Sequence, residues 1–103
     1  MNKTNLTDVE FAKEVNEILN LIADKVEDHD IEGLIDVDLN GDILTLTNDK
    51  GVFVINKQSA AKEIWLSSPI SGPYHFAKDG KYWQSKNNAE LFNILGSELH
   101  IKF

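Results

Sequence analysis

The stretch from Ile35 to Asn56, IDVDLNGDILTLTNDKGVFVIN, decides the fold of this chain. Its apolar residues alternate with polar ones, and a period of two is typical of a strand that buries one face. Asn40-Gly41 is a strong hairpin signal between two such runs, and residues 48–51 carry a second turn signal. The stretch therefore predicts short strands joined by tight turns, which together make an antiparallel meander.

The meander continues downstream. Glu63–Ser67 predicts a fourth strand, residues 74–76 a fifth and residues 81–83 a short sixth, while Pro and Gly keep residues 68–73 as a turn. Ile64 and Leu66 should then face the core, with Trp65 on the other side of the sheet.

A helix is expected at each end of the chain. Apolar residues recur at three- and four-residue spacing over residues 7–28, and Thr7 with Glu10 forms a capping-box pattern. A second helix is expected from about Asn88, with Gly96 weakening it. Helix, meander and helix predict an α+β fold. We expect a two-layer α/β sandwich in which five to six antiparallel strands carry both helices on one face and leave the other face to solvent.

Composition limits the classes of function. A chain of 103 residues with 42% hydrophobic residues is expected to form one domain over residues 1–103. It has no cysteine and no apolar run of membrane-spanning length. The N-terminal residues carry neither a signal core nor an Arg-rich transit pattern, so a cytoplasmic location is expected.

Charge is concentrated in the first third of the chain. Residues 1–38 hold 11 acidic residues against three lysines, a net charge of −8, whereas the remainder carries a net charge of +1. Such a field repels nucleic acid and anionic lipid, and it attracts cations or a basic protein surface.

An acidic ridge is the first candidate site, because carboxylate oxygens suit hard cations such as iron. It is predicted on the outer face of the first helix and the adjoining first strand, with His29 as a possible supplementary ligand. The alternative is an ordinary solvated helix face. Because like charges on one face repel one another, neutralising Asp24, Glu27, Asp28 and Asp30 together is expected to leave the domain folded. The candidate ligands are Glu17, Asp24, Glu27, Asp28, His29, Asp30, Glu32, Asp36 and Asp38.

The outer face of the sheet is the second candidate site. The strand period places Trp65 outside together with Asn56 and His75, and an aromatic residue ringed by polar groups is typical of an interface hot spot. The alternative is that Trp65 only covers the sheet. Ser67 or Ser68 near His75 suggests a nucleophile and base, but no third group orients them and no cleft is expected there. No catalytic residue is therefore predicted.

Residues 54–58, VINKQ, and residues 64–73, IWLSSPISGP, resemble the signature of the frataxin family. Chain length and the sequence Tyr74-His-Phe76 resemble its bacterial CyaY branch, which would place the protein in a bacterial cytoplasm. The resemblance implies weak binding of Fe²⁺ and Fe³⁺ through the ridge acids. It also implies binding to the cysteine desulfurase and scaffold machinery of iron–sulfur cluster assembly, where the protein regulates assembly or supplies iron. The partner surface implied by the resemblance is Asn56, Gln58, Trp65 and His75.

The resemblance also implies a monomer in the absence of iron, and it leaves room for a weak ferroxidase activity. Two alternatives stay open. The first is a ferroxidase that stores iron, which would need paired and buried carboxylates. The second is a protein-interaction module that binds no physiological metal.

Overall fold

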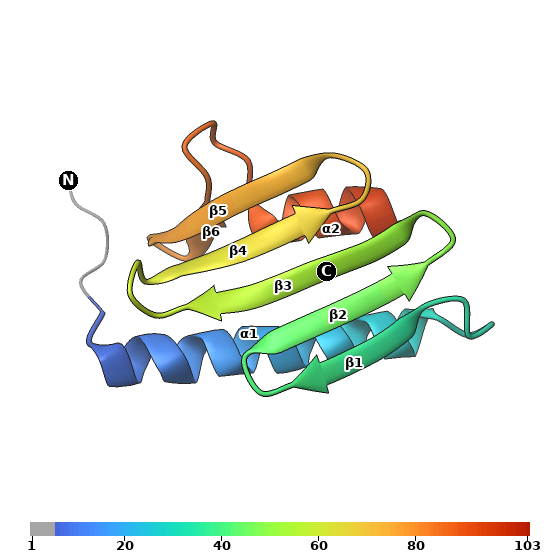
Figure 1. The fold of residues 1–103 in the computed structure, drawn as a ribbon, viewed down its shortest axis with the longest axis horizontal. Coiled ribbons are helices and arrows are strands. Elements are labelled where there is room, and N and C mark those ends of the chain that lie inside the picture. Colours follow the sequence, from blue (N-terminus) through green and yellow to red (C-terminus); the bar gives the residue numbers. More distant parts are fainter. Residues whose placement is uncertain (1–5) are drawn as a thin grey trace.

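The computed structural model describes residues 6–103 and confirms the predicted architecture (Figure 1). Within these residues, six strands form one antiparallel sheet in which each strand pairs with the next in sequence, so their order is β1-β2-β3-β4-β5-β6. Helices α1 and α2 lie together on one face of this sheet, and no helix of the described residues covers the other face. The elements are α1 Asp8–His29, β1 Asp36–Asn40, β2 Ile43–Asn48, β3 Gly51–Gln58, β4 Glu63–Ser68, β5 Gly72–Asp79, β6 Tyr82–Gln84 and α2 Leu91–Leu99.

The start of α1 follows from its capping box. The Thr7 hydroxyl accepts a hydrogen bond from the Glu10 backbone N–H, and the Glu10 carboxylate accepts one from the Thr7 N–H. These two bonds satisfy donors that a helix N-terminus otherwise leaves open. The hydrogen bond from the Thr7 backbone N–H to the carboxylate also holds the pKa of Glu10 below its usual value. The predicted start of α1 is therefore confirmed, and the capping box explains it.

The predicted bounds of β5 and the predicted start of α2 were wrong. Strand β5 runs from Gly72 to Asp79 rather than from Tyr74 to Phe76, and it includes Pro73. Because β6 pairs only with residues 77–79, the first part of β5 has no strand on that side among the described residues, and a proline is tolerated there. Helix α2 begins at Leu91 rather than near Asn88, since Asn88 has a φ of +65° and cannot belong to a right-handed helix.

One core lies between the helices and the sheet. It is built from the alternating inner residues of the strands and the apolar stripes of both helices, as the period predicted. Trp83 is buried in it against Phe11, with ring centroids 6.1 Å apart. A half-buried ion pair between Glu14 and Lys78 further joins α1 to β5.

Gly96 has a structural reason that the sequence did not reveal. A Cβ atom at this position would lie 2.8 Å from the carbonyl oxygen of Ile101, so only glycine lets the chain after α2 turn back onto the helix. His100 makes that turn in the left-handed conformation, and the N–H of Ile101 donates to the Gly96 carbonyl. Ile101 is then buried, and the ring of Phe103 packs against Phe92.

No helix among residues 6–103 is long and apolar enough to cross a membrane.

Candidate functional site

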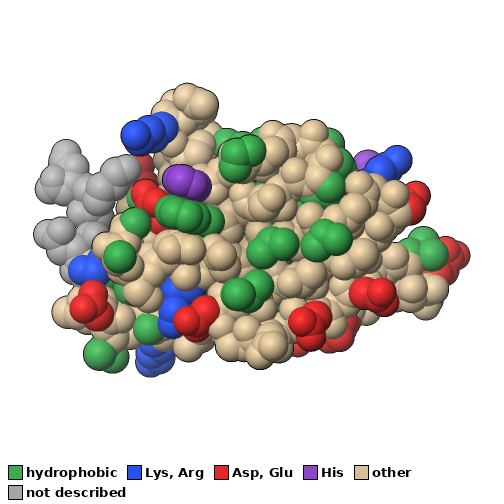
Figure 2. Space-filling view, in the orientation of Figure 1, with side chains coloured by type: hydrophobic (Ala, Val, Ile, Leu, Met, Phe, Trp, Pro, Cys, Tyr) green, Lys and Arg blue, Asp and Glu red, His purple; other side chains and the backbone are tan. Residues whose placement is uncertain are grey.

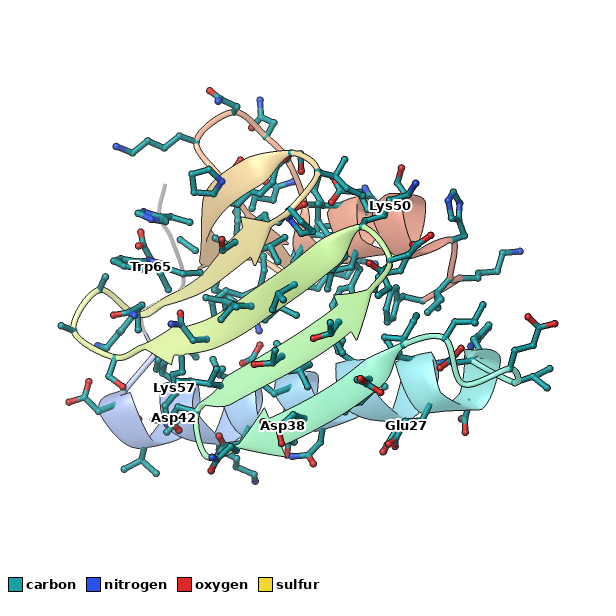
Figure 3. The ribbon with its side chains drawn as sticks, turned by 45° about the vertical axis from the view of Figure 1, so that its right-hand side comes forward. Glu27, Asp38, Asp42, Lys50, Lys57 and Trp65 are labelled. Carbon is teal, nitrogen blue, oxygen red and sulfur yellow. The ribbon has the colours of Figure 1, made fainter. Side chains whose placement is uncertain are left out.

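The predicted ridge lies along the edge of the molecule formed by α1 and β1. Figure 3 shows Glu27 on α1 and Asp38 on β1 projecting from this edge, and Figure 2 shows acidic side chains along the same border. Of the nine candidate ligands, all but Asp30 are exposed. The acids are thus accessible to a cation in solution.

The ridge residues do not converge on a preformed metal centre. Within residues 6–103, no three His, Asp or Glu side chains are grouped closely enough to hold a metal ion. Ions attracted here would meet carboxylates that are spread along a helix and an edge strand, each hydrated and screened by salt. The arrangement fits weak electrostatic binding and does not fit a ferroxidase centre of paired, buried carboxylates.

Asp30 differs from the other ridge acids because its carboxylate is already engaged. One oxygen accepts the Leu34 N–H at 2.7 Å and the other accepts the Ile35 N–H at 2.8 Å. These bonds fix the loop that leads from α1 into β1, so Asp30 has a structural role that the charge pattern concealed. The neighbouring His29 donates from Nδ1 to the Lys25 carbonyl at 2.9 Å, because a carbonyl can only accept, and its Nε2 is left as the ring nitrogen available to a ligand.

The second candidate site is a row of residues that crosses the open face of the sheet. Strand register places Asn40, Ile43, Asn56, Trp65 and His75 opposite one another on five successive strands, and we call this set the open-face row. Gln58 lies in the next register position, opposite Glu63. Figure 2 views this face and shows hydrophobic groups gathered within polar surroundings. The predicted side of Trp65 is confirmed, since Ile64 and Leu66 are both buried in the core.

Trp65 is half-buried and held in place rather than freely exposed. Its indole Nε1–H donates to Oε1 of Glu63 at 2.8 Å, and its ring stacks on His75 with centroids 4.0 Å apart and planes 7° from parallel. Nδ1 of His75 lies 4.0 Å from the same Glu63 oxygen. The sequence predicted Glu63 as the start of the fourth strand and gave it no role, although its spacing of two residues from Trp65 places both side chains on the same face.

A shallow pocket of about 140 Å³ opens beside Trp65 between β3, β4 and β5. Asn56, Trp65 and His75 contribute to its lining. The side-chain oxygen of Asn56 is buried and has no hydrogen-bond partner among the described residues. The middle of the open face therefore holds a desolvated acceptor next to an ordered aromatic ring.

Two serines of the IWLSSPISGP segment are structural. The hydroxyl of Ser68 donates to Glu98 of α2 at 2.6 Å and accepts the N–H groups of Ile70 and Ser71. The Ser71 hydroxyl donates to the other oxygen of Glu98, so this carboxylate ties α2 to the β4–β5 turn. Because Ser68 is buried and bound to Glu98, the Ser68–His75 pairing considered from the sequence does not exist.

Comparison with known proteins places the whole chain in one family. A model of the frataxin-like domain matches residues 4–103. The mitochondrial frataxin homolog of Schizosaccharomyces pombe is 41% identical over 100 residues, which cover 90% of this chain and 63% of that protein. The chain spans about half the length of the curated relatives it matches.

Solved structures share the fold. A frataxin from Psychromonas ingrahamii superimposes with a TM-score of 0.80 at 23% identity, covering 91% of this chain and 89% of that one. A trimeric frataxin from Saccharomyces cerevisiae, complexed with ferrous iron, gives a TM-score of 0.72 at 33% identity, covering 97% of this chain and 88% of that one. These likenesses agree with the predicted sandwich.

The expected bacterial cytoplasmic location was wrong. The relatives from S. pombe, Leishmania donovani and Arabidopsis thaliana are all named mitochondrial proteins. The expectation rested on the resemblance to the bacterial branch and on the first residues of the sequence, and those residues carry no information on location when the relatives are longer.

Proposed function

The chain belongs to the frataxin family, and from this premise we propose that it binds iron weakly and regulates, or supplies iron to, iron–sulfur cluster assembly. We propose that it acts by binding the cysteine desulfurase and scaffold machinery. The observation that carries the proposal is the open-face row, which presents Trp65 on the sheet face opposite to α1 and α2. Aromatic residues ringed by polar groups contribute much of the binding energy in protein interfaces.

The partner surface in this proposal consists of Asn56, Gln58, Trp65 and His75. Their support is that they lie on adjacent positions of β3, β4 and β5, beside the pocket at Trp65. The test is calorimetric binding of the desulfurase. We expect Trp65→Ala to weaken binding by roughly 2 kcal/mol or more, about 30-fold, as for an aromatic hot spot.

Tyr82→Ala is the matched control for that measurement, because Tyr82 is an exposed aromatic of β6 outside the open-face row. It should leave the affinity unchanged. A Trp65→Ala protein that melts far below the parent and binds normally once folded would mark Trp65 as a packing residue and would contradict the proposal.

Iron binding is proposed for the ridge acids Glu17, Asp24, Glu27, Asp28, Glu32, Asp36 and Asp38, with His29 as a further ligand. The net charge of −8 over residues 1–38 supports this, as does the ferrous complex of the S. cerevisiae frataxin. Iron should perturb the NMR signals of residues 17–38, and added salt should weaken the effect. Perturbations centred on His75 or His100, with the ridge unchanged, would contradict the assignment.

The rival functions find less support. An iron-storing ferroxidase would need clustered carboxylates, which the described residues do not provide. A metal-independent interaction module would bind the partner normally and show no response to iron in the ridge. Identity of 41% to the S. pombe protein, against 23% to the bacterial structure, favours a mitochondrial-type frataxin over a CyaY-type one. We therefore propose mitochondria as the location and a monomer as the iron-free state.

A further inference from the structure

Glu63 makes the contact that fixes the indole ring of Trp65. Its Oε1 atom accepts the Nε1–H at 2.8 Å, and the same atom lies 4.0 Å from Nδ1 of His75, whose ring covers one face of the indole. The side chain of Glu63 is 28% exposed and that of His75 is 54% exposed, so the cluster stands on the surface and forms no part of the core. Three side chains from two strands thus hold one another in a single arrangement.

We propose that Glu63 is a positioning residue for partner recognition, which holds Trp65 in the orientation that the partner binds. This inference rests on the proposed function. It adds Glu63 to the residues that determine partner affinity, with an effect that depends on Trp65. An immobilised side chain loses less conformational entropy on binding than a mobile one, so affinity should depend on the hydrogen bond even though Glu63 need not touch the partner.

The geometry also limits what the partner can recognise. Because the only donor of the indole is already bonded to Glu63, the partner meets Trp65 as an apolar and aromatic surface. Phenylalanine at position 65 keeps an aromatic face and lacks the N–H group. Trp65→Phe therefore separates an effect of Glu63 that passes through the indole from a direct contact between Glu63 and the partner.

The test is a double-mutant cycle with Glu63→Ala and Trp65→Phe, measured by calorimetric binding to the desulfurase. Glu63→Ala alone should weaken binding roughly three- to tenfold, the range for one side chain that must be ordered on binding. In the Trp65→Phe background the same change should have no further effect. An effect that persists in that background would overturn the proposal, since Glu63 would then contact the partner directly.

Asp79→Ala is the matched control, because it removes one carboxylate from the exposed end of the neighbouring strand β5. It should leave the affinity at the parent value in buffer of physiological ionic strength, where exposed charges are screened. A loss equal to that of Glu63→Ala would show that net charge alone explains the result, and this would also overturn the proposal.

A second measurement needs no partner. The indole N–H signal of Trp65, assigned by its loss in Trp65→Phe, should shift in Glu63→Ala and exchange faster with water, while the melting temperature stays close to the parent value. An indole signal that does not respond to Glu63→Ala would overturn the positioning role. A parent protein that binds no desulfurase would instead overturn the proposed function, and with it the recognition half of this inference.

Discussion

Asn56 lies in the middle of the open face with a buried side-chain oxygen that no described residue satisfies. A buried acceptor without a partner costs free energy, which a well-shaped apolar replacement would recover. A partner that displaces the side chains covering this oxygen and brings a donor would complete the hydrogen bond. Stability of the free protein and recognition of the partner then place opposite demands on this residue.

Asn56→Leu tests this conflict, since leucine is similar in size and brings no acceptor. We expect the free energy of unfolding to rise by about 1 kcal/mol. We expect desulfurase binding to weaken in the same variant. Thermal melts and calorimetry measure the two quantities, and a variant that is both less stable and fully able to bind would contradict this account.

The sequence predicted which side of the sheet each of these residues occupies, and it did not predict their contacts. Strand alternation placed Trp65, Asn56 and His75 outside, because the period of two follows from backbone geometry alone. The bond from Trp65 to Glu63 depends on rotamers that alternation does not specify. The burial of the unpaired side-chain oxygen of Asn56 depends on how closely neighbouring side chains cover it, and no local sequence pattern predicts this.

At the scale of elements, the acids of the ridge divide into two kinds. Most are exposed on α1 and β1, whereas Asp30 binds two backbone N–H groups in the loop between these elements. The expectation that neutralising Asp24, Glu27, Asp28 and Asp30 together leaves the domain folded therefore fails to account for these two bonds of Asp30.

Asp30→Ala should lower the free energy of unfolding by about 1–3 kcal/mol, because it leaves two backbone donors without their acceptor. Asp28→Ala is the matched control, since Asp28 is exposed on α1, and it should change stability by no more than about 0.5 kcal/mol. Chemical denaturation in metal-free buffer measures both. Equal effects of the two changes would show that Asp30 is an ordinary surface acid.

Helix α2 depends on a single carboxylate for its link to the β4–β5 turn. Glu98→Ala removes the acceptor of both Ser68 and Ser71, and Ser68 is buried, so we expect a loss of about 1–3 kcal/mol. Glu17→Ala, which removes an exposed helical carboxylate, is the control. A melting temperature unchanged by Glu98→Ala would mean that packing alone holds α2.

The elements themselves were largely predictable, and their exceptions have local causes. The capping box and the apolar stripe of α1 are strong signals, so its start was placed within one residue. The start of α2 was missed because the left-handed conformation of Asn88 is set by the loop around it. The bond between Ser68 and Glu98 joins residues 30 positions apart, and a pattern read along the chain cannot reveal such a pair.

At the scale of the whole molecule, the ridge and the open-face row are two surfaces built around a single hydrophobic core. The ridge follows the α1–β1 edge, and the open-face row crosses the opposite side of the same sheet from the helices (Figure 1). Both helices pack on that one core, and the single domain expected over residues 1–103 stays a prediction.

We expect thermal unfolding to be one cooperative transition, because neither helix has a core of its own. Circular dichroism at 222 nm and the fluorescence of buried Trp83 should give the same midpoint. Separate midpoints for the two probes would indicate that the chain unfolds in more than one unit.

The position of β1 at the border of the sheet has a consequence for solubility. One side of its backbone has no strand partner among residues 6–103, and an exposed strand of this kind can pair with another molecule unless charge or shape prevents it. Asp36 and Asp38 project from this strand, so the acids proposed to attract iron also keep neighbouring molecules apart. Cations bound there would remove the repulsion and favour self-association. We accordingly expect the double variant Asp36→Asn, Asp38→Asn to scatter more light than the parent in metal-free buffer, whereas a monodisperse variant would show that the border is protected by other means.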